Sequence, residues 1–355
     1  MTSDYITAKE AASAWGISQR RVSVLCSEQR ISGATRLGNM WIIPKSAEKP
    51  IDARSLRYSD SKKLKPFLKW AGGKGQIVDE IRRKYPAELG TSIKKYAEPF
   101  VGGGAVLFDI LNNYDLDEVY ISDTNAELIN TYACIKNDID SLVNVLSKFQ
   151  DTYLPMNDDD RKTFYYAKRD RFNELKADNI HDTELAALFI FLNRTCFNGL
   201  YRVNRHGAFN VPMGSYKSPT ICDENNLRNV SEALTDVTII CGDYHESEDF
   251  IDSSTFVYFD PPYRPLTETA SFTSYTENEF DDAAQRRLAA YIIHLSEAGT
   301  HVLASNSDPK NTNPDDEFFD DLYSELNINR ISASRMINSN ASKRGKISEL
   351  LICNY

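Results

Sequence analysis

The fold is decided by one stretch of the sequence, Glu98-Pro99-Phe100-Val101-Gly102-Gly103-Gly104-Ala105. The run at residues 95–100 is short and apolar, as in a buried strand, and the residues after the glycines predict a helix. Glycine permits a positive φ and lets the backbone approach a ligand closely. A strand, three glycines and a helix therefore indicate a ligand-binding turn, although a purely structural turn would explain them almost as well.

Outward from this turn, short apolar runs alternate with amphipathic helices. Strands are expected at residues 95–100, 118–123, 237–241, 255–260, 301–305 and 349–354, and helices at 77–85, 125–148, 161–177, 183–195 and 279–298. This alternation predicts an α/β fold with a mainly parallel sheet. Residues 151–234 interrupt it with helices and then a loop-like stretch rich in Asn, Arg, Gly and aromatics, which is typical of a substrate-recognition insertion.

An acidic residue at the end of the next strand narrows the ligand class. Asp123 follows Gly102 by 21 residues, and in nucleotide-binding α/β folds an acid there binds the ribose hydroxyls. The dinucleotide fingerprint would need a glycine where this chain has Leu107. A pyrophosphate ligand is therefore disfavoured. An adenosyl group without phosphates fits better, and S-adenosylmethionine is such a ligand.

A second glycine-rich stretch, Pro66-Phe67-Leu68-Lys69-Trp70-Ala71-Gly72-Gly73-Lys74, imitates a phosphate loop. A Walker loop would need glycine at the position of Leu68 and serine or threonine at that of Gly75, so the ATPase interpretation fails. An aromatic residue and a lysine remain on a glycine turn. They could hold the carboxylate of S-adenosylmethionine or a DNA phosphate.

The sharpest chemical signal is Asp260-Pro261-Pro262-Tyr263, which follows an apolar strand. The exocyclic amine of adenine is conjugated with its ring and is a poor nucleophile, so two acceptors on its hydrogens would localise the lone pair. We expect these acceptors to be the Asp260 carboxylate and the Pro261 carbonyl, because Pro262 restricts the backbone between them and Tyr263. Tyr263 is expected to stack on a base that has left the duplex. Alignment with the methyl donor would supply most of the acceleration.

The cysteines exclude several other chemistries. Methylation at cytosine carbon 5 needs a cysteine nucleophile, usually after proline, and no Pro-Cys pair occurs in the sequence. The six cysteines form no Cys-x-x-Cys pair, so they predict neither a metal site nor a disulfide framework and favour a reducing cytoplasm. We also expect no membrane span and no secretory signal, because no apolar run is long enough and the N-terminus lacks a basic start.

The net charge of −10 argues against a nucleic-acid partner only when it is taken as a whole-molecule sum. Acidic residues crowd into 158–160 and 315–321, whereas basic residues gather in three other stretches, at 62–84, 194–217 and 330–346. Any one basic cluster could be a solvated face. Three clusters beside the motifs above and below favour a groove lined for phosphates.

The N-terminal segment, residues 1–48, predicts a separate small module. Thr7 and Glu10 have the spacing of a capping box for a helix at 8–12. A turn at 15–18 separates it from a second helix, and residues 36–43 predict a hairpin that turns at Gly38-Asn39. The second helix is expected to carry Arg20, Arg21, Val22 and Leu25. The segment resembles the excisionase and MerR-like helix-turn-helix modules, although a protein-contacting helical module remains an alternative. Residues 49–64 are polar and are predicted to form a linker.

From residue 65 to the end, the chain resembles the Dam-type DNA adenine (N6) methyltransferases. The resemblance rests on the three motifs above and on further ones in the family's order: Leu192-Asn193-Arg194, Asn198-Gly199-Leu200-x-Arg202, Phe209-Asn210-Val211-Pro212, Phe272-Thr273-x-Tyr275 and Glu349-Leu350-Leu351. It implies a Rossmann-like catalytic core at 65–150 and 235–355 with a target-recognition insertion at 151–234. It also implies a prokaryotic or phage-type enzyme of the cytoplasm that works on double-stranded DNA in the nucleoid.

The resemblance also implies roles for individual residues. The cofactor pocket would be lined by Trp70, Ala71, Gly72, Lys74, Glu98, Phe100, Gly102, Gly104, Asp123, Asp243 and Asp260. The flipped adenine would be held by Asp260, Pro261, Pro262 and Tyr263. The DNA target is commonly GATC in this family. The residues that would contact its bases or insert between them are Lys69, Phe197, Asn198, Leu200, Arg202 and Pro212. Arg202 suits a guanine edge and Phe197 suits insertion beside the flipped base, with core packing of Phe197 as the alternative.

Three other functions stay open at this point. The first is N4-cytosine methylation, whose enzymes tend to carry serine where Asp260 stands. The second is RNA methylation. The third is a DNA-binding regulator with an inactive core, against which the intact Asp260 and glycine turn argue. A cognate restriction endonuclease that acts on the same site is a further possible partner.

Overall fold

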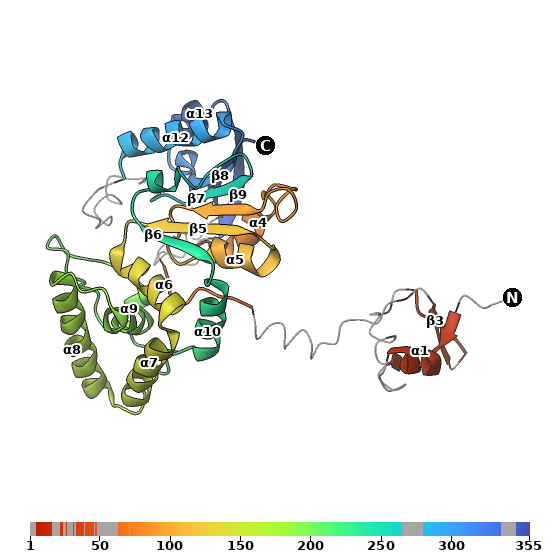
Figure 1. Cartoon of the computed structure of the whole chain (residues 1–355), viewed down its shortest axis with the longest axis horizontal. Helices are drawn as coiled ribbons and strands as arrows, with labels where there is room; N and C mark the ends of the chain where they lie inside the picture. The colour runs from red at the N-terminus through yellow and green to blue at the C-terminus, as the bar shows by residue number, and fades with distance from the viewer. Residues whose placement is uncertain are drawn as a thin grey trace. The chain divides into compact units, whose positions relative to one another are not determined.

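The computed structural model describes residues 5–15, 22–23, 26, 31, 33–38, 40–45, 47, 63–70, 72–264, 280–334 and 346–355. The chain divides into two compact units, Met1–Lys62 and Lys63–Tyr355. The first unit is red in Figure 1, and the second runs from orange to blue.

The first unit contains a small antiparallel sheet and a helix. Its elements are β1 (Tyr5–Thr7), α1 (Ala8–Trp15), β2 (Thr35–Leu37) and β3 (Met40–Pro44), and the sheet order is β1-β3-β2. The predicted capping box is confirmed, because Thr7 N donates to Glu10 Oε2 (2.7 Å) and Glu10 N donates to Thr7 Oγ1 (3.3 Å). The predicted hairpin is confirmed too, and Gly38 at its turn has a φ of 58°.

The predicted second helix of the first unit lies largely outside the described residues. Val22 and Cys26 are described, and they are buried with Ala11 and Ile43 in a core that belongs to this unit. Strand β1 was not predicted, because three residues are too short to show a period in the sequence.

The second unit is built on a seven-stranded sheet. Its strands are β4 (Lys95–Glu98), β5 (Glu118–Asp123), β6 (Val237–Cys241), β7 (Thr255–Phe259), β8 (His301–Ser307), β9 (Asn327–Ser334) and β10 (Lys346–Cys353), in the order β6-β5-β4-β7-β8-β10-β9. The first five strands in this order run parallel to one another, and β10 runs antiparallel to both β8 and β9. The predicted mainly parallel α/β fold is confirmed.

Helices cover both faces of this sheet. Phe256 and Tyr258 of β7 are buried on the face with α5 (Ala105–Asn113) and α6 (Ala126–Asn137), whereas Val257 and Phe259 are buried on the opposite face with α12 (Asp282–Glu297) and α13 (Phe318–Leu322). Figure 1 shows these two helical layers on either side of the strands. A central strand that is buried on both faces has to be apolar throughout, and β7 is fully buried along its length.

Three longer helices pack beside the sheet. They are α7 (Ile139–Tyr153), α8 (Asp158–Ala177) and α9 (Thr183–Thr195), which contact one another, while α9 also contacts α6. They are followed by α10 (Glu224–Ala233), which packs on α6 and α7 (Figure 1). The almost wholly buried α9 therefore joins the predicted recognition insertion to the catalytic core.

Some element predictions were wrong. The helix predicted at 125–148 is two helices, because the backbone leaves the helical region at Asp138 (φ −144°, ψ 45°), whose carboxylate accepts from Thr183 Oγ1 (2.6 Å). The strand predicted at 95–100 ends at Glu98, before a proline that has no N–H for the ladder. The helix predicted at 77–85 covers only α4 (Val78–Arg82), behind the short helix η1 (Lys74–Gln76). Helix α10 and strand β9 were not predicted.

The chain order of the strands creates the crevice that holds the site. From β4 the chain proceeds outward through β5 and β6, and it then returns to the other side of β4 for β7 and β8. In open parallel sheets, ligands bind at the carboxyl ends of the strands where the order reverses. Here that point lies between β4 and β7, so the sheet brings the glycine turn after β4 close to the residues after β7.

Candidate active site

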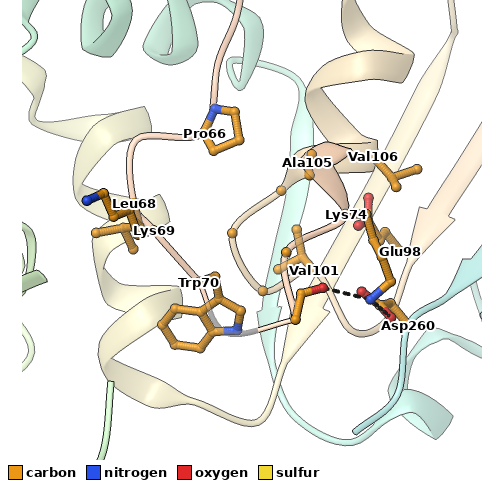
Figure 2. Close-up of a pocket in the computed structure, with 16 residues that line it drawn as sticks. Pro66, Leu68, Lys69, Trp70, Lys74, Glu98, Val101, Ala105, Val106 and Asp260 are labelled. Atoms are coloured by element: carbon orange, nitrogen blue, oxygen red, sulfur yellow. Dashed lines mark hydrogen bonds and ion pairs between the residues drawn. The ribbon is translucent and has the colours of Figure 1, made fainter. Parts of the chain in front are cut away.

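A pocket of about 280 Å³ lies at this reversal of strand order. It is lined by the two glycine-rich segments and by the acid that follows β7 (Figure 2). Of the predicted cofactor residues, those that line it are Trp70, Gly72, Lys74, Glu98, Gly102, Gly104 and Asp260. Lys69, which was predicted to contact DNA, also lines it.

Positions 102 and 104 of this turn require glycine. Gly102 and Gly104 have φ values of 48° and 71°, in the left-handed region that other residues rarely adopt. A Cβ atom on Gly102 would lie 2.8 Å from Cδ1 of Trp70, and one on Gly104 would lie 2.5 Å from the hydroxyl of Tyr132. The turn therefore allows the indole of Trp70 to close the pocket against bare backbone.

Asp123 holds this turn from the neighbouring strand. Its Oδ2 accepts from the backbone N–H of Gly102 (3.1 Å) and its Oδ1 accepts from that of Asn125 (2.9 Å). Burial raises the pKa of Asp123, and the two N–H donors act against that shift. Asp123 supports the pocket from behind the glycine turn and is not one of its lining residues.

Asp260 and Lys74 form an ion pair in the pocket. The distance from Lys74 Nζ to Asp260 Oδ1 is 2.6 Å, and Nζ also donates to the carbonyl of Gly72 (2.8 Å), as the dashed lines in Figure 2 mark. Ser305 Oγ donates to the same carboxylate oxygen (2.9 Å). Lys74 is only 5% exposed and lines the pocket. The sequence predicted that it holds either a cofactor carboxylate or a DNA phosphate.

A second carboxyl group lies beside this pair. Glu98 is 2% exposed and accepts a hydrogen bond from the hydroxyl of Tyr96 (2.7 Å). Burial raises the pKa of Glu98 well above its ordinary value, and the charge of Asp260 adds to that rise, whereas the Tyr96 hydrogen bond and Lys74 oppose it. A buried carboxyl group near another acid and one ammonium retains its proton to a higher pH than usual.

The rest of the Asp-Pro-Pro-Tyr segment follows the carboxyl end of β7. Pro261 is buried, Pro262 is exposed, and the hydroxyl of Tyr263 donates to Glu349 Oε2 on β10 (2.9 Å). The ring of Tyr263 lies 4.4 Å from the ammonium of Lys74. Lys74 therefore joins Asp260 and Tyr263 into one charged and aromatic group.

Besides Asp123, two further predicted cofactor residues lie outside the pocket lining, and another is not described. The ring of Phe100 stacks on Tyr244 with centroids 5.7 Å apart. Asp243 is exposed after β6 and accepts from the ring nitrogen Nδ1 of His245 (2.7 Å). Ala71 lies outside the described residues.

The predicted DNA-contacting residues gather on one turn and its neighbours. Phe197 is 52% exposed, which excludes the alternative that it packs in the core, and Leu200 is 36% exposed. The N–H of Phe197 donates to the carbonyl of Pro212 (2.8 Å), and Asn198 adopts a positive φ of 57° in the short helix η2 (Phe197–Gly199). Arg202 Nε donates to Asn210 Oδ1 (2.8 Å).

The turn at residues 197–200, which is predicted to contact DNA and is here called the recognition turn, contacts the predicted cofactor loop at residues 66–74. The ring of Tyr201 stacks on Trp70 with centroids 5.7 Å apart and planes 21° apart. A Cβ atom on Gly199 would lie 2.6 Å from Cδ of Lys69, so the backbone at Gly199 packs directly against the Lys69 side chain. The structure therefore brings the predicted cofactor and DNA residues to adjoining surfaces.

Three side chains that touch the Asp-Pro-Pro-Tyr segment were not predicted to be part of the site. They are Ser305, Gln285, whose Nε2 donates to the carbonyl of Pro262 (2.9 Å), and Glu349. Glu349 belongs to a quoted motif, but no role was derived for it. Sequence spacing carries no signal for these contacts, because 23 to 86 residues separate the partners.

Among the residues that the structure describes, no group of three or more His, Cys, Asp or Glu side chains is gathered as a metal site requires. No described helix has the length and apolar character to cross a membrane.

A Rossmann-like sheet with a glycine turn at the strand reversal and an acidic Pro-Pro-Tyr segment beside it is the architecture of an S-adenosylmethionine-dependent methyltransferase. The model of the D12 class N6 adenine-specific DNA methyltransferases matches residues 70–337, three quarters of the chain. The chain belongs to this family.

Similar proteins agree with this assignment. The Type II methyltransferase M.MjaIII of Methanocaldococcus jannaschii is 51% identical over 294 residues, which cover 82% of this chain and 99% of that protein. The Type II methyltransferase M1.LlaDCHI of Lactococcus lactis subsp. cremoris is 36% identical over 294 residues (82% and 96%). The DNA adenine methylase of Haemophilus influenzae is 35% identical over 292 residues (81% and 93%).

These similarities confirm the predicted reaction class. The chain is an adenine-specific DNA methyltransferase, and the enzymes of its family take the methyl group from S-adenosylmethionine. N4-cytosine methylation is set aside by the adenine specificity of the family.

Proposed function

We propose that this enzyme methylates the N6 amine of an adenine flipped out of duplex DNA, within GATC sites. In this proposal, Asp260 and the Pro261 carbonyl accept the two amine hydrogens and Tyr263 stacks on the base. The single observation that carries it is that Asp260 and the glycine turn at 102–104 line the same pocket. A methyl donor on the turn would then lie next to the amine that Asp260 orients.

The contacts of Asp260 support an orienting role. Both of its side-chain contacts within the described part of the chain, from Lys74 and Ser305, fall on Oδ1. Oδ2 is therefore the oxygen available to an incoming amine. With Lys74 and Ser305 holding the other oxygen, the carboxylate would need little reorganisation when the base enters.

The cofactor would lie along the two glycine-rich segments. Trp70 lies over the turn where any Cβ atom at 102 would collide with it, so the adenosyl group would meet an aromatic wall and bare backbone. Lys74 would supply a positive charge beside Asp260 and close to the reacting atoms. Phe100, Asp123 and Asp243 are proposed to complete the cofactor contacts from the ends of β4, β5 and β6.

The exposed recognition turn supports DNA reading. Phe197 is half exposed and next to Asn198, which suits an apolar wedge that fills the space left by the flipped base. Arg202 suits bidentate hydrogen bonds to a guanine edge in the major groove. Lys69, Leu200 and Pro212 adjoin this turn and are proposed to complete the contact with the target.

Three further parts of the proposal rest on the sequence or on the relatives. The first unit is proposed to be a helix-turn-helix module that adds DNA contacts. A restriction endonuclease with the same target is proposed as a partner, because M.MjaIII and M1.LlaDCHI are named Type II methyltransferases. The place of action is proposed to be the nucleoid of a prokaryotic cytoplasm.

Methyl transfer to defined duplexes tests the proposal. The purified protein is incubated with labelled S-adenosylmethionine and either a duplex that contains one GATC or the same duplex with that site permuted to GTAC, and digested nucleosides are separated. We expect label only in N6-methyladenine and only from the GATC duplex. Asp260→Ala should abolish the transfer, and Asp236→Ala, at an exposed carboxylate before β6, should not. Equal labelling of both duplexes would remove GATC as the target, and an active Asp260→Ala would remove the proposed chemistry.

A further inference from the structure

A buried pair of side-chain amides lies behind the Asp-Pro-Pro-Tyr segment. Gln285 on α12 is 0% exposed, its Nε2 donates to the carbonyl of Pro262 (2.9 Å), and its Oε1 accepts from Asn306 Nδ2 (3.0 Å). A buried amide is costly unless its polar atoms are hydrogen-bonded. Both ends of Gln285 are satisfied, and this pairing fixes which end faces Pro262.

Asn306 extends the pair to the other side of Tyr263. It lies on β8 and is 2% exposed, and its Oδ1 accepts from the backbone N–H of Arg264 (3.2 Å) and from that of Ser307 (2.9 Å). The two amides therefore hold the backbone immediately before and immediately after Tyr263.

These amide contacts matter because the two prolines offer few backbone groups that can form hydrogen bonds. Pro261 and Pro262 have no N–H, so their carbonyls are the only backbone groups through which these two residues can form hydrogen bonds. The Pro262 carbonyl is occupied by Gln285, whereas within the described part of the chain no donor reaches the carbonyl of Pro261. Among the described residues, an arriving amine would therefore meet one carbonyl that accepts no hydrogen bond and one that is already bonded.

We propose that Gln285 and Asn306 are positioning residues that reserve the Pro261 carbonyl for the amine by occupying the Pro262 carbonyl and fixing the backbone around Tyr263. This inference rests on the proposed role of the segment in binding the adenine amine. Neither residue touches the substrate in this scheme. They act on the rate of transfer and not on the affinity for S-adenosylmethionine, because the pocket lining does not include them.

The first test replaces Gln285 by leucine in the full chain. Gln285→Leu keeps the approximate volume but removes the donor to Pro262. We expect kcat for methyl transfer to a GATC duplex to fall about 100-fold, since small misplacements of reacting groups cost that much. The Kd for S-adenosylmethionine should stay within about twofold, because proximity is lost and not cofactor contact.

A matched control removes a similar amide grip at the other end of β8. Asn354 accepts from the N–H of Val302 (3.0 Å) and donates to the carbonyl of Thr300 (2.9 Å), far along the strand from Asn306. Asn354→Leu should leave kcat close to the wild-type value at a temperature below both melting points. If both variants lose the same fraction of kcat, the effect is general destabilisation and the proposal is overturned.

A second variant adds a readout that loss of packing would not produce. In Gln285→Glu an ionised carboxylate cannot donate to the Pro262 carbonyl, whereas the protonated acid can donate to it and still accept from Asn306. We therefore expect its kcat relative to wild type to rise as the pH falls. A ratio that does not change with pH overturns the proposal, and this variant decides the matter if Gln285→Leu does not fold. A wild-type protein that labels no adenine would instead overturn the proposed function.

Discussion

At the centre of the pocket, two carboxyl groups share one ammonium. Lys74 pairs with Asp260, and Glu98 is buried beside them. Burial raises the pKa of Glu98, and the charge of Asp260 adds to the rise because two neighbouring carboxylates resist ionising together. A neutral Glu98 would leave the single charge of Lys74 to balance Asp260, the acid proposed to orient the amine.

The raised pKa of Glu98 makes stability depend on pH. In the unfolded chain Glu98 ionises near its ordinary pKa of 4.5, and in the folded protein it ionises at a higher pH. Its contribution is therefore fully present below the ordinary value and is lost as the pH rises through the folded pKa. Relative to Glu98→Gln, the unfolding free energy of the wild type should fall by up to about 1.4 kcal/mol per pH unit in that window.

Urea unfolding of both proteins from pH 4 to pH 8 measures this difference. Glu232→Gln, at an exposed position on α10, serves as the control and should show no such trend. Parallel curves for the wild type and Glu98→Gln would mean that Glu98 is not buried as a neutral acid.

Of two glycines that line the same pocket, Gly102 and Gly75, only the first has no room for a side chain. Substituting each in turn tests whether the turn needs a bare backbone or whether any change near the pocket weakens binding. Gly102→Ala puts a methyl group 2.8 Å from the indole of Trp70 at a positive φ, whereas a Cβ atom on Gly75 meets nothing within 4 Å. We expect Gly102→Ala to weaken S-adenosylmethionine binding at least about tenfold, because the left-handed backbone and the indole resist the new methyl group together. Gly75→Ala should change the Kd by less than about twofold. Calorimetric titration measures both values, and equal values for the two variants would contradict the role of the turn.

At the scale of elements, one side chain at the end of α9 joins the cofactor loop to the recognition turn. Asn193 is 4% exposed, and its Oδ1 accepts from Lys69 N (2.8 Å) while its Nδ2 donates to the carbonyls of Lys69 (2.7 Å) and Gly199 (3.0 Å). The loop before Trp70 and the turn after Phe197 thus share one anchor. Under the proposed function, this anchor would couple DNA reading to cofactor binding.

Asn193→Ala should therefore weaken both ligands at once. Removal of the amide leaves the carbonyls of Lys69 and Gly199 and the N–H of Lys69 without this partner, so we also expect a loss of about 2 to 4 kcal/mol in unfolding free energy. Asn173 is the matched control, because it holds Phe209 by the same two-sided grip, with its Oδ1 accepting (2.8 Å) and its Nδ2 donating (3.1 Å), but does not touch the cofactor loop. Asn173→Ala should weaken duplex binding and leave the Kd for S-adenosylmethionine unchanged. The coupling is refuted if Asn193→Ala changes only one of the two affinities.

At the scale of the whole molecule, each of the two units has a hydrophobic core of its own. The core of the first unit runs from Ala8 to Ile43, and those of the second unit lie between Leu64 and Cys353. The family match begins at residue 70, inside the second unit. Catalysis and the proposed extra DNA contact are therefore carried by separately folded parts.

A protein that consists of residues 63–355 should keep its methyl transfer to a short GATC duplex within a few-fold of the full chain. It should bind DNA more weakly, and the dependence of log Kd on log salt concentration should become shallower, because fewer phosphates are neutralised. Affinity measured at several salt concentrations reports this slope. An unchanged slope would remove DNA binding from the roles of the first unit, and loss of kcat would show that the first unit takes part in catalysis.

Residues that line the pocket could be predicted because their signals are local in sequence. Glycines after a strand permit the left-handed backbone found at Gly102 and Gly104, an acid ends the next strand, and Asp260 is followed by two prolines that have no N–H. Each signal spans a few residues or one strand-helix repeat, so the strands at 118–123 and 237–241 were also predicted to the residue.

Contacts between distant segments were decided only by the tertiary structure. The break at Asp138, the edge strand β9, the exposed position of Asp243 and the grip of Gln285 and Asn306 on Pro262 and Arg264 leave no pattern in the sequence. Helix and strand periods record which face of an element is buried, but they do not record which distant amide meets which carbonyl. That pairing exists only once the sheet has set β7, β8 and α12 side by side.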